Sequence, residues 1–458
     1  MKSDFITADF LLETDCAREL YHRFAEHAPI VDFHNHLAAA DIAADKRHED
    51  IGRFWVCADG YKYRAMRIAG LDERYMTGDA TPREKFDAWC GVLPHTIGSP
   101  LFHWSCMEMK KVFGIDDVPD KDNCAGVWEA CNKKLALPAY SSNALLKSFG
   151  VIIASTSDDL LDDVSIHSRA SEVSGIRIAP SLRADSILSF DKPAFEPWFE
   201  RLGPVQTLDT YLEAVRQRLD IFQANGCRLS DHALDNGFSF IKTSFDEADR
   251  LFRRRKDLSR PESLKLRSFV LDFLAREYAR RGWVMQLHIG AERWTSSRLR
   301  AVAGPAGGYA CQGSPCDVRA LCDFLDCLDI DGLLPKTLLY TLNPADNASF
   351  ATLTGSFSES GQEKIKFGPA WWYNDHKYGI EENLKNVASY SLLFRSLGMT
   401  TDSRTILSFS RHEYFRRILC NFIGKLAEGG EIPADMDFLG QAVLDISYRN
   451  AKHWIYEQ

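Results

Sequence analysis

The chain has 458 residues, of which 45% are hydrophobic, 12% aromatic and 26% charged. This composition supports a large folded core and excludes a disordered, collagen-like or fibrous protein. The formal net charge of −9, with no concentrated basic tract, argues against a nucleic-acid-binding protein, although a locally basic pocket can still bind an anionic small molecule.

The twelve cysteines are scattered along the chain, which is typical of reduced thiols rather than of a disulfide scaffold. The first residues include Asp4, Asp9 and Glu13, where a secretion signal needs a basic start and an apolar core. No stretch approaches the roughly 20 consecutive apolar residues of a membrane helix. We therefore expect a cytoplasmic protein with no membrane partner.

Short apolar segments recur along the chain between longer helical patterns. Such runs, bounded by polar residues or glycine, are typical of strands buried on both faces of a parallel sheet. Eight segments fit this description: Ile30–His36, Val151–Thr156, Ile176–Pro180, Cys227–Asp231, Trp283–His288, Thr337–Asn343, Lys364–Gly368 and Leu397–Asp402. Eight strands that alternate with helices predict an α/β fold, a (β/α)₈ TIM barrel, and residues 1–458 are interpreted as one barrel domain.

Helical patterns lie between the later strands. The segment Thr207–Ala224 places Leu208, Tyr211, Leu212 and Val215 at intervals of three and four residues, the spacing of one helix face. Similar patterns predict further helices over Phe245–Arg281, Asp317–Leu328, Ile380–Phe394 and His412–Ala427.

The connection after the first strand is far longer than the others. Residues 40–148 are predicted to form a helical insertion between strands one and two, with helices over Arg83–Val92, Leu101–Phe113 and Ala125–Lys134. Connections of this kind leave the barrel at the C-terminal ends of its strands, where catalytic residues lie. The insertion is therefore expected to contribute to the mouth of the active site.

Polar residues stand at nearly every predicted strand end. They are His34, Asn35 and His36 (first strand), Arg183 (third), Asp231 and His232 (fourth), His288 (fifth), Asn343 (sixth), Trp371–Asp375 (seventh) and Asp402–Arg404 (eighth). Each of these residues alone is weak evidence for an active site. Because the C-terminal ends of barrel strands meet on one face, the polar residues at these ends are expected to lie together and to form the active site.

The pair His34 and His36 is spaced for metal binding. Residues two apart in a strand point to the same side, so both imidazoles can bind one ion together with Asp402 and His288 from other strand ends. Nitrogen ligands with one carboxylate favour a single divalent ion, zinc, with manganese or iron as alternatives. The pair is also compatible with two histidines that only form hydrogen bonds in a polar pocket.

Carboxylates and arginines at the strand ends supply candidate acid–base and substrate-binding groups. Asp231 and Asp402 would stay ionised beside a cation and could act as bases, although Asp231 could instead cap a loop or helix. Arg183 and Arg404 can each bind a carboxylate, or form an internal salt bridge. Arg411 follows the last strand on a helix and is interpreted as bracing the structure.

Neither a glycine-rich phosphate loop nor a G-x-S-x-G motif is present, so no nucleotide cofactor is expected.

Seven long strings carry a family resemblance. They are VDFHNHL at 31–37, DGYKYRAMR at 59–67, TGDATPREKFDAW at 77–89, SDHALD at 230–235, QLHIGA at 286–291, FGPAWWYND at 367–375 and MTTDSRTILSFSRHEYFRRILCNFIG at 399–424. These strings resemble the uronate (glucuronate) isomerase family of the amidohydrolase superfamily. The resemblance implies reversible aldose–ketose isomerisation of a small-molecule hexuronate: D-glucuronate to D-fructuronate, and D-galacturonate to D-tagaturonate.

The resemblance also implies roles for single residues. It assigns metal binding to His34, His36, Asp402 and His288; catalysis to Tyr61, Asp231 and Asp402; and substrate binding to Arg404, Arg183, His288 and Trp371. The sequence departs from the family pattern in the insertion: where the family reads D-H-Y-K-W-R, this chain has Gly60 in place of the histidine and Tyr63 in place of the tryptophan.

The isomerisation moves one proton from C2 to C1 and another from the C2 hydroxyl to O1 through an enediol, and it needs no redox cofactor. The main alternative is a metal-dependent hydrolase of the same superfamily that opens a sugar lactone or a related ester or amide. Such enzymes usually carry a lysine on strand four, where this chain has Asp231. A homo-oligomer is compatible with the sequence.

Overall fold

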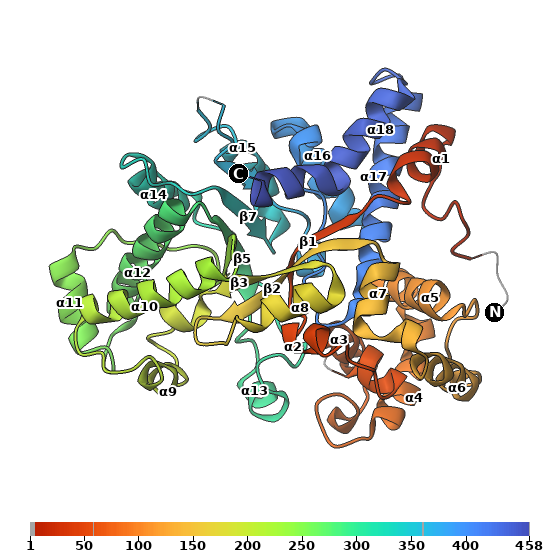
Figure 1. The fold of residues 1–458 in the computed structure, drawn as a ribbon, viewed down its shortest axis with the longest axis horizontal. Coiled ribbons are helices and arrows are strands. Elements are labelled where there is room, and N and C mark those ends of the chain that lie inside the picture. The colour runs from red at the N-terminus through yellow and green to blue at the C-terminus, as the bar shows by residue number, and fades with distance from the viewer. Residues whose placement is uncertain (1–4, 58, 360, 458) are drawn as a thin grey trace.

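A curved sheet of parallel strands forms the centre of the molecule (Figure 1). The computed structural model describes residues 5–57, 59–359 and 361–457. In hydrogen-bonded order, the parallel strands are β1 (Ile30–Asn35), β2 (Val151–Asp159), β3 (Arg177–Arg183), β4 (Leu229–Asp235), β5 (Val284–Glu292), β7 (Thr337–Thr341) and β8 (Ile365–Phe367). A short strand, β6 (Cys311–Gln312), pairs antiparallel with the end of β5.

These parallel strands correspond to the first seven predicted strands, and their bounds differ from the predicted ones by at most four residues. Most of their residues are buried, as expected for a sheet covered on both faces. The α/β barrel class is confirmed.

The predicted eighth strand, Leu397–Asp402, is not a regular strand. Two backbone hydrogen bonds join this part of the chain to β1: Asp402 N–H donates to His34 C=O (3.0 Å), and His36 N–H donates to Ser403 C=O (2.9 Å). Asp402 has a φ of 47°, which interrupts the extended backbone that a regular ladder requires. The segment still lies beside β1, where the last strand of a barrel would close the sheet.

Helices surround the sheet (Figure 1). After β2 they are α8 (Ile166–Ser174), α9 (Phe195–Glu200), α10 (Leu208–Ala224), α11 (Phe245–Arg253), α12 (Arg260–Arg281), α13 (Ser297–Ala303), α14 (Val318–Asp329), α15 (Asn347–Leu353), α16 (Lys377–Tyr390), α17 (Ser410–Glu428) and α18 (Met436–Leu444). The single helix predicted over Phe245–Arg281 is two helices. Pro261 and a capping box between Ser259 and Glu262 begin a new helix at Arg260.

The connection between β1 and β2 forms a helical body beside the barrel. Its helices are α2 (Ala39–Ala43), α3 (Gly60–Ile68), α4 (Pro82–Val92), α5 (Pro100–Phe113), α6 (Cys124–Leu135) and α7 (Ser142–Ser148). The three helices predicted in this region correspond to α4, α5 and α6. A capping box between Thr81 and Glu84, with Pro82 at the first position, explains where α4 begins.

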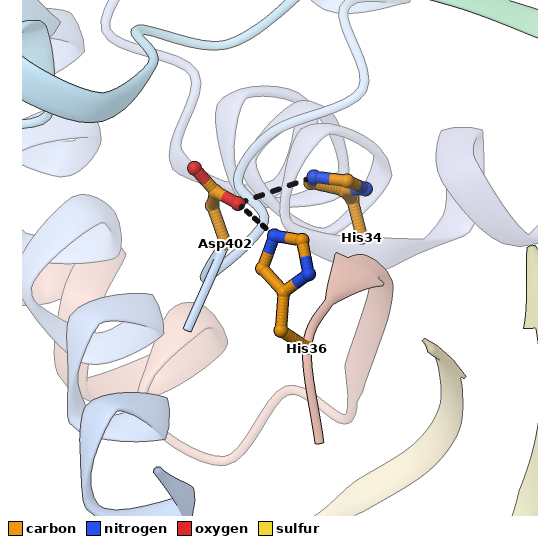
Figure 2. Close-up of side chains that lie close together, drawn as sticks. All are labelled: His34, His36 and Asp402. Carbon is orange, nitrogen blue, oxygen red and sulfur yellow. Dashed lines mark hydrogen bonds and ion pairs between the residues drawn. The ribbon is translucent and has the colours of Figure 1, made fainter. Parts of the chain in front are cut away.

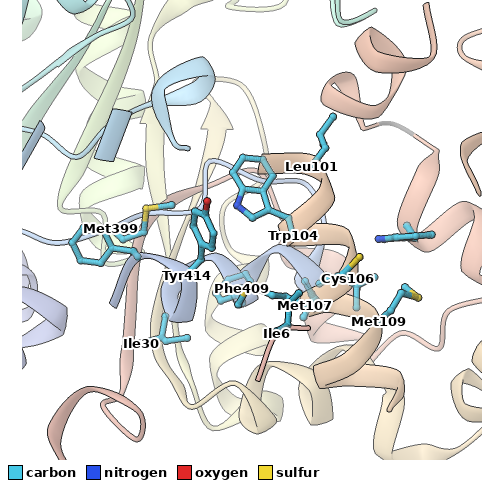
Figure 3. Packing of buried hydrophobic residues seen from close by; sticks show 14 of the residues in the cluster. Ile6, Ile30, Leu101, Trp104, Cys106, Met107, Met109, Met399, Phe409 and Tyr414 are labelled. Atoms are coloured by element: carbon cyan, nitrogen blue, oxygen red, sulfur yellow. The ribbon is translucent and has the colours of Figure 1, made fainter. Parts of the chain in front are cut away.

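One apolar cluster joins this helical body to α1 (Asp15–Leu20), α17 and α18. Figure 3 shows Trp104 of α5 beside Tyr414 of α17, with ring centroids 6.4 Å apart. The body is therefore packed against the last helices of the barrel rather than connected to it only through the chain.

Another apolar cluster runs through the barrel, from the end where the strands begin to Tyr340 and Trp371 at the opposite end. Trp454, Ile455 and Tyr456 near the C-terminus pack with Val31 and Ile153 at the end where the strands begin. None of the helices in the described part of the chain combines the length and apolar character that a bilayer crossing requires.

Candidate active site

Imidazoles and carboxylates from β1, β4, β5 and the segment after β8 meet at the C-terminal ends of the strands. Asp402 Oδ1 lies 3.2 Å from His34 Nε2 and 2.9 Å from His36 Nε2 (Figure 2). On the other side of His34, Asp231 lies 3.9 Å from His34 Nδ1 and 3.2 Å from His288 Nδ1. The structure brings together all five residues that the sequence predicted as metal ligands or carboxylate bases.

These residues fit a divalent metal ion. His34, His36 and Asp402 form one group, and His34, Asp231 and His288 form another; in each group the candidate ligand atoms lie within 4.8 Å of one another. Nε2 of His288 is buried and has no hydrogen-bond partner among the described residues. A buried imidazole nitrogen with a free lone pair is costly unless it binds a proton or an ion. The set therefore includes residues that could hold a metal.

The electrostatics of the cluster also favour a bound cation. Burial opposes ionisation of Asp231 and Asp402, but the neighbouring histidines hold the pKa of each carboxyl well below its usual range. Burial likewise opposes protonation of His34, but the carboxylates of Asp231 and Asp402 overcome it and raise the pKa of His34 to about 9. Two ionised carboxylates thus share one buried site, which a metal ion would neutralise.

Asp231 lies inside β4 rather than at its end, because the strand continues to Asp235. Its carboxylate accepts a hydrogen bond from the hydroxyl of Ser157 (2.7 Å) and faces the cluster. It does not begin a helix, so the capping interpretation is wrong.

Aromatic side chains hold the cluster from one side. The indole N–H of Trp371 donates to Asp402 Oδ2 (2.9 Å). The ring of His288 stacks on Tyr340, with centroids 4.2 Å apart, and contacts Trp371 at 4.7 Å. Tyr340 was not predicted as a site residue, because within an apolar strand it cannot be distinguished from a core aromatic.

Two cavities meet at the site. One, of about 370 Å³, is lined by the cluster together with Arg183, Trp371 and Tyr61. The other, of about 430 Å³, extends along the insertion. Gly60, Tyr61, Asp402 and Arg404 line both cavities. This shared boundary is where the barrel and the insertion face each other.

The two predicted arginines differ in their surroundings. Arg183 Nε donates to Asp185 (2.9 Å), so it forms the internal salt bridge considered as an alternative while still lining the smaller cavity. Arg404 is exposed and forms no ion pair with the residues that the structure describes. It is the cation on the cavity wall with the greatest freedom to bind an anion.

Tyr61 reaches the site from the start of α3. Asp59 caps this helix by accepting hydrogen bonds from the backbone N–H groups of Tyr61 (2.9 Å) and Lys62 (3.2 Å). The Tyr61 hydroxyl donates to Asp375 (3.1 Å), and Arg411 also donates to this carboxylate (3.2 Å). Asp375 was predicted only as part of the polar run at the end of the seventh strand, without a role of its own, and Arg411 was predicted only to brace the structure. The polar run after the seventh predicted strand was the available signal for Asp375.

A loop between α13 and β6, residues 305–310, forms a roof over the smaller cavity. Arg64 and Arg67 of α3 donate to the carbonyls of Ala310 (3.0 Å) and Gly307 (2.9 Å). Gly308 lies so close to α3 that a Cβ there would be 2.3 Å from the Gly60 carbonyl oxygen. The sequence did not predict that this loop lines the cavity.

The fold and the site together define a (β/α)-barrel enzyme with a candidate metal site. The model of the family described as glucuronate isomerase matches residues 1–455. The chain belongs to this family.

The relatives agree in name and in length. The chain is 41% identical to a uronate isomerase of Caldanaerobacter subterraneus subsp. tengcongensis (98% of this chain, 99% of that one) and 42% identical to one of Geobacillus thermodenitrificans (98% of each). The solved structure of uronate isomerase from Thermotoga maritima has a TM-score of 0.93 at 32% identity, over 99% of this chain and 100% of that one. These names favour the isomerase over the lactone hydrolase that the sequence left as an alternative.

A solved structure of a metal-dependent hydrolase candidate from Lactobacillus casei matches with a TM-score of 0.56 at 14% identity, over 95% of this chain and 97% of that one. At this identity the likeness shows the fold alone.

Proposed function

We propose that this enzyme interconverts the aldose and ketose forms of hexuronates, D-glucuronate with D-fructuronate and D-galacturonate with D-tagaturonate. The observation that carries the proposal is the smaller cavity, which combines the metal-ligand cluster, Tyr61 and three arginines, Arg183 and Arg404 among them, in one space. Isomerisation needs a base, a proton donor at the carbonyl oxygen and a cationic environment for the substrate carboxylate. The lining supplies a candidate for each.

The proposed metal ligands are His34, His36, Asp402 and His288. We favour zinc, with manganese or iron as alternatives, because imidazole nitrogens dominate the ligand set. When bound, such an ion would polarise the oxygens of the substrate and help to neutralise its charge. Trp371 would hold Asp402 through its indole hydrogen bond and form one wall of the pocket.

Arg404 and Arg183 would bind the substrate carboxylate. Arg404 supports this role because it is an exposed cation on the boundary of both cavities. Arg183 already shares its charge with Asp185, so it would make the smaller contribution. Although the protein as a whole has a negative net charge, these arginines make the cavity wall locally cationic, so it can bind an anionic substrate.

Asp231 would take the proton from C2, with Asp402 as the alternative base. Asp231 stays ionised at neutral pH, because the neighbouring histidines hold its pKa well below the usual range against the effect of burial. Tyr61 would act at the C1–C2 end, where its hydroxyl can donate to the developing oxyanion. Proton return to C1 would complete the enediol pathway.

The residues 1–458 would act as a single barrel domain, in which residues 40–148 are the insertion that supplies Tyr61. The packing of α5 against α17 supports this division, because it fixes α3 at the mouth of the barrel.

The test is to incubate the metal-loaded enzyme with D-glucuronate and D-galacturonate separately, in deuterated water, and to follow ketose formation by NMR. We expect ketose from at least one substrate, with solvent deuterium at C1 of the product. The variant Arg319→Gln, which changes an exposed arginine of α14, serves as the control for Arg404→Gln, which should raise KM. Hydrolysis of a sugar lactone without turnover of either uronate would overturn the proposal.

A further inference from the structure

A buried carboxylate lies directly behind Tyr61. One oxygen of Asp375, Oδ2, accepts the hydrogen bond from the Tyr61 hydroxyl (3.1 Å) and another from Arg411 Nη1 (3.2 Å). The side chains of Asp375 and Arg411 are each 5% exposed. Because both partners are almost fully buried, water cannot replace either hydrogen bond.

Arg411 belongs to the same buried group. Its guanidinium carbon lies 4.0 Å from the ring centroid of Trp104 and 5.1 Å from that of Tyr61. A cation over an aromatic ring is attracted to it, and the attraction increases if the ring becomes a phenolate. Three segments distant in sequence (α3, α17 and the turn after β8) thus hold the Tyr61 hydroxyl in one direction.

Tyr61 and Asp375 differ in their access to substrate. Tyr61 lines both cavities, whereas Asp375 is absent from the described residues that line either one. Asp375 can therefore act on a bound substrate only through its neighbours, Tyr61 and Arg411, and of these two only Tyr61 also lines the smaller cavity with the ligand cluster. A carboxylate in this position can orient the hydroxyl, receive its proton, and return it.

We propose that Asp375 is a positioning residue for Tyr61 and exchanges a proton with it during isomerisation; this inference rests on the proposed role of Tyr61. When Tyr61 takes the proton from the C2 hydroxyl, its own phenol proton moves to Asp375 along the existing hydrogen bond. When the phenol proton passes to O1, Asp375 returns the stored proton to Tyr61. Over the cycle one proton has moved from O2 to O1, and both residues are restored.

Burial and the carboxylate of Asp375 raise the pKa of Tyr61 well above its usual value, so its proton can leave only as another arrives from the C2 hydroxyl. Burial raises the pKa of Asp375 to about 7, even though Arg411 and the Tyr61 hydrogen bond act to lower it. A carboxyl group that titrates near neutrality can both accept and release a proton under working conditions. Arg411 keeps a positive charge beside the pair and would stabilise a transient phenolate.

The test is a double-mutant cycle on the metal-loaded enzyme with Tyr61→Phe, Asp375→Asn and the double variant. We expect Asp375→Asn to lower kcat by on the order of 10²-fold, with a much smaller change in KM. If Asp375 acts through Tyr61, the double variant should be as slow as Tyr61→Phe alone, because residues that act as a unit are not additive. A purely structural role would not produce this pattern.

The control is Asp346→Asn, which changes another buried carboxylate near the barrel mouth. Asp346 accepts hydrogen bonds from the Cys316 N–H (3.0 Å) and the Thr341 hydroxyl (3.1 Å) and does not contact Tyr61. We expect its kcat to stay within about threefold of the original chain. Thermal unfolding and metal content are measured for every variant, and Asp375→Glu replaces Asp375→Asn in the cycle if the latter does not fold.

The outcomes separate this inference from the function on which it rests. A large loss in Tyr61→Phe with an unchanged kcat in Asp375→Asn, or with additive losses in the double variant, overturns the proton exchange alone. An unchanged kcat in Tyr61→Phe removes Tyr61 from the mechanism and overturns both.

Discussion

Asp32 joins the metal-ligand segments through its side chain, in addition to the two backbone hydrogen bonds between them. Its carboxylate accepts hydrogen bonds from the Thr400 hydroxyl (2.6 Å), the Thr401 N–H (3.1 Å) and the Thr401 hydroxyl (2.6 Å). The Thr400 hydroxyl oxygen also accepts from the His34 N–H (2.9 Å). These contacts supplement the two backbone hydrogen bonds between the segments, and together they hold His34 and Asp402 in place. Groups of this kind orient metal ligands without touching the ion.

Asp32→Asn should weaken metal binding. The NH2 group of the asparagine is a hydrogen-bond donor, and it would face the hydroxyl and N–H groups of Thr400 and Thr401 that donate to the carboxylate. We expect a loss of metal affinity of roughly 10- to 100-fold and a loss of about 1–3 kcal/mol in the free energy of unfolding. Competition with a chelator measures the first and urea unfolding the second. Thr401→Ser, which keeps the hydroxyl, is the control. Unchanged metal affinity in Asp32→Asn would show that the backbone alone sets the ligand geometry.

Asp231→Asn tests the proposed C2 base. A positioned base contributes about 10²- to 10⁴-fold, so kcat should fall by that factor, while the nearly equal volume of the amide preserves the fold. Steady-state kinetics and the rate of deuterium exchange at C2 are the measurements. Asp220→Asn, on the outer helix α10, serves as the control. An unchanged kcat would transfer the role of base to Asp402.

At the scale of elements, the strands could be predicted because each is a buried apolar run with a polar end. That polar end also identified the ligand cluster, since strand direction alone brings these residues to one face. The predicted bounds of the eighth strand and of the longest helix were wrong because single residues determine the backbone conformation there. The φ of Asp402 breaks the eighth strand, and Pro261 divides the long predicted helix.

The parts of the site that were missed depend on contacts between distant segments. Tyr61 and Asp375 are 314 positions apart, and Arg67 and Gly307 are 240 apart. No periodicity or spacing encodes such pairs, because they depend on how α3 packs at the barrel mouth. The roof loop is rich in glycine and alanine, so it carries no pattern that distinguishes it from an ordinary connection.

Gly308→Ala should disturb the roof. Its φ is +77°, and a Cβ would lie 2.3 Å from the Gly60 carbonyl oxygen, so the loop must move away from α3. We expect kcat/KM to fall by on the order of 10- to 100-fold, because small displacements of a pocket wall misplace the substrate. Gly332→Ala, with a φ of +66° and open space around it, controls for backbone strain alone. Equal kinetics for the two variants would show that the roof does not position substrate.

At the scale of the whole molecule, the ligand cluster and the C-terminal segment lie at opposite ends of the barrel. The ligand cluster stands where the strands end, whereas Trp454, Ile455 and Tyr456 close the opposite end. The Tyr456 hydroxyl also bonds to the Ser155 hydroxyl (2.7 Å) inside the barrel. These three residues therefore close the core at the end opposite the site cavities, while the apolar cluster to which they belong extends to Trp371.

Ile455→Ala should lower stability without changing catalysis. The side chain is fully buried (0% exposed), and removing it from a packed core costs about 2–5 kcal/mol in the free energy of unfolding. Ile330→Ala, at a position that is 76% exposed, should change stability by less than about 0.5 kcal/mol. Urea unfolding and kcat at a temperature well below the transition provide the readouts. A lower kcat in Ile455→Ala would show that the two ends of the barrel are coupled.

The origin of Tyr61 outside the barrel has a consequence for how such an enzyme can diversify. The proposed metal ligands stand on or beside the strands, but the tyrosine and its helix belong to one connection that shares a core with α17. The proposed ion ligands and C2 base are thus encoded with the barrel strands, whereas the hydroxyl proposed to act on the substrate oxygens is encoded in one connection. Exchange of that single connection would leave the ligands and the base in place and change the group that faces the substrate oxygens.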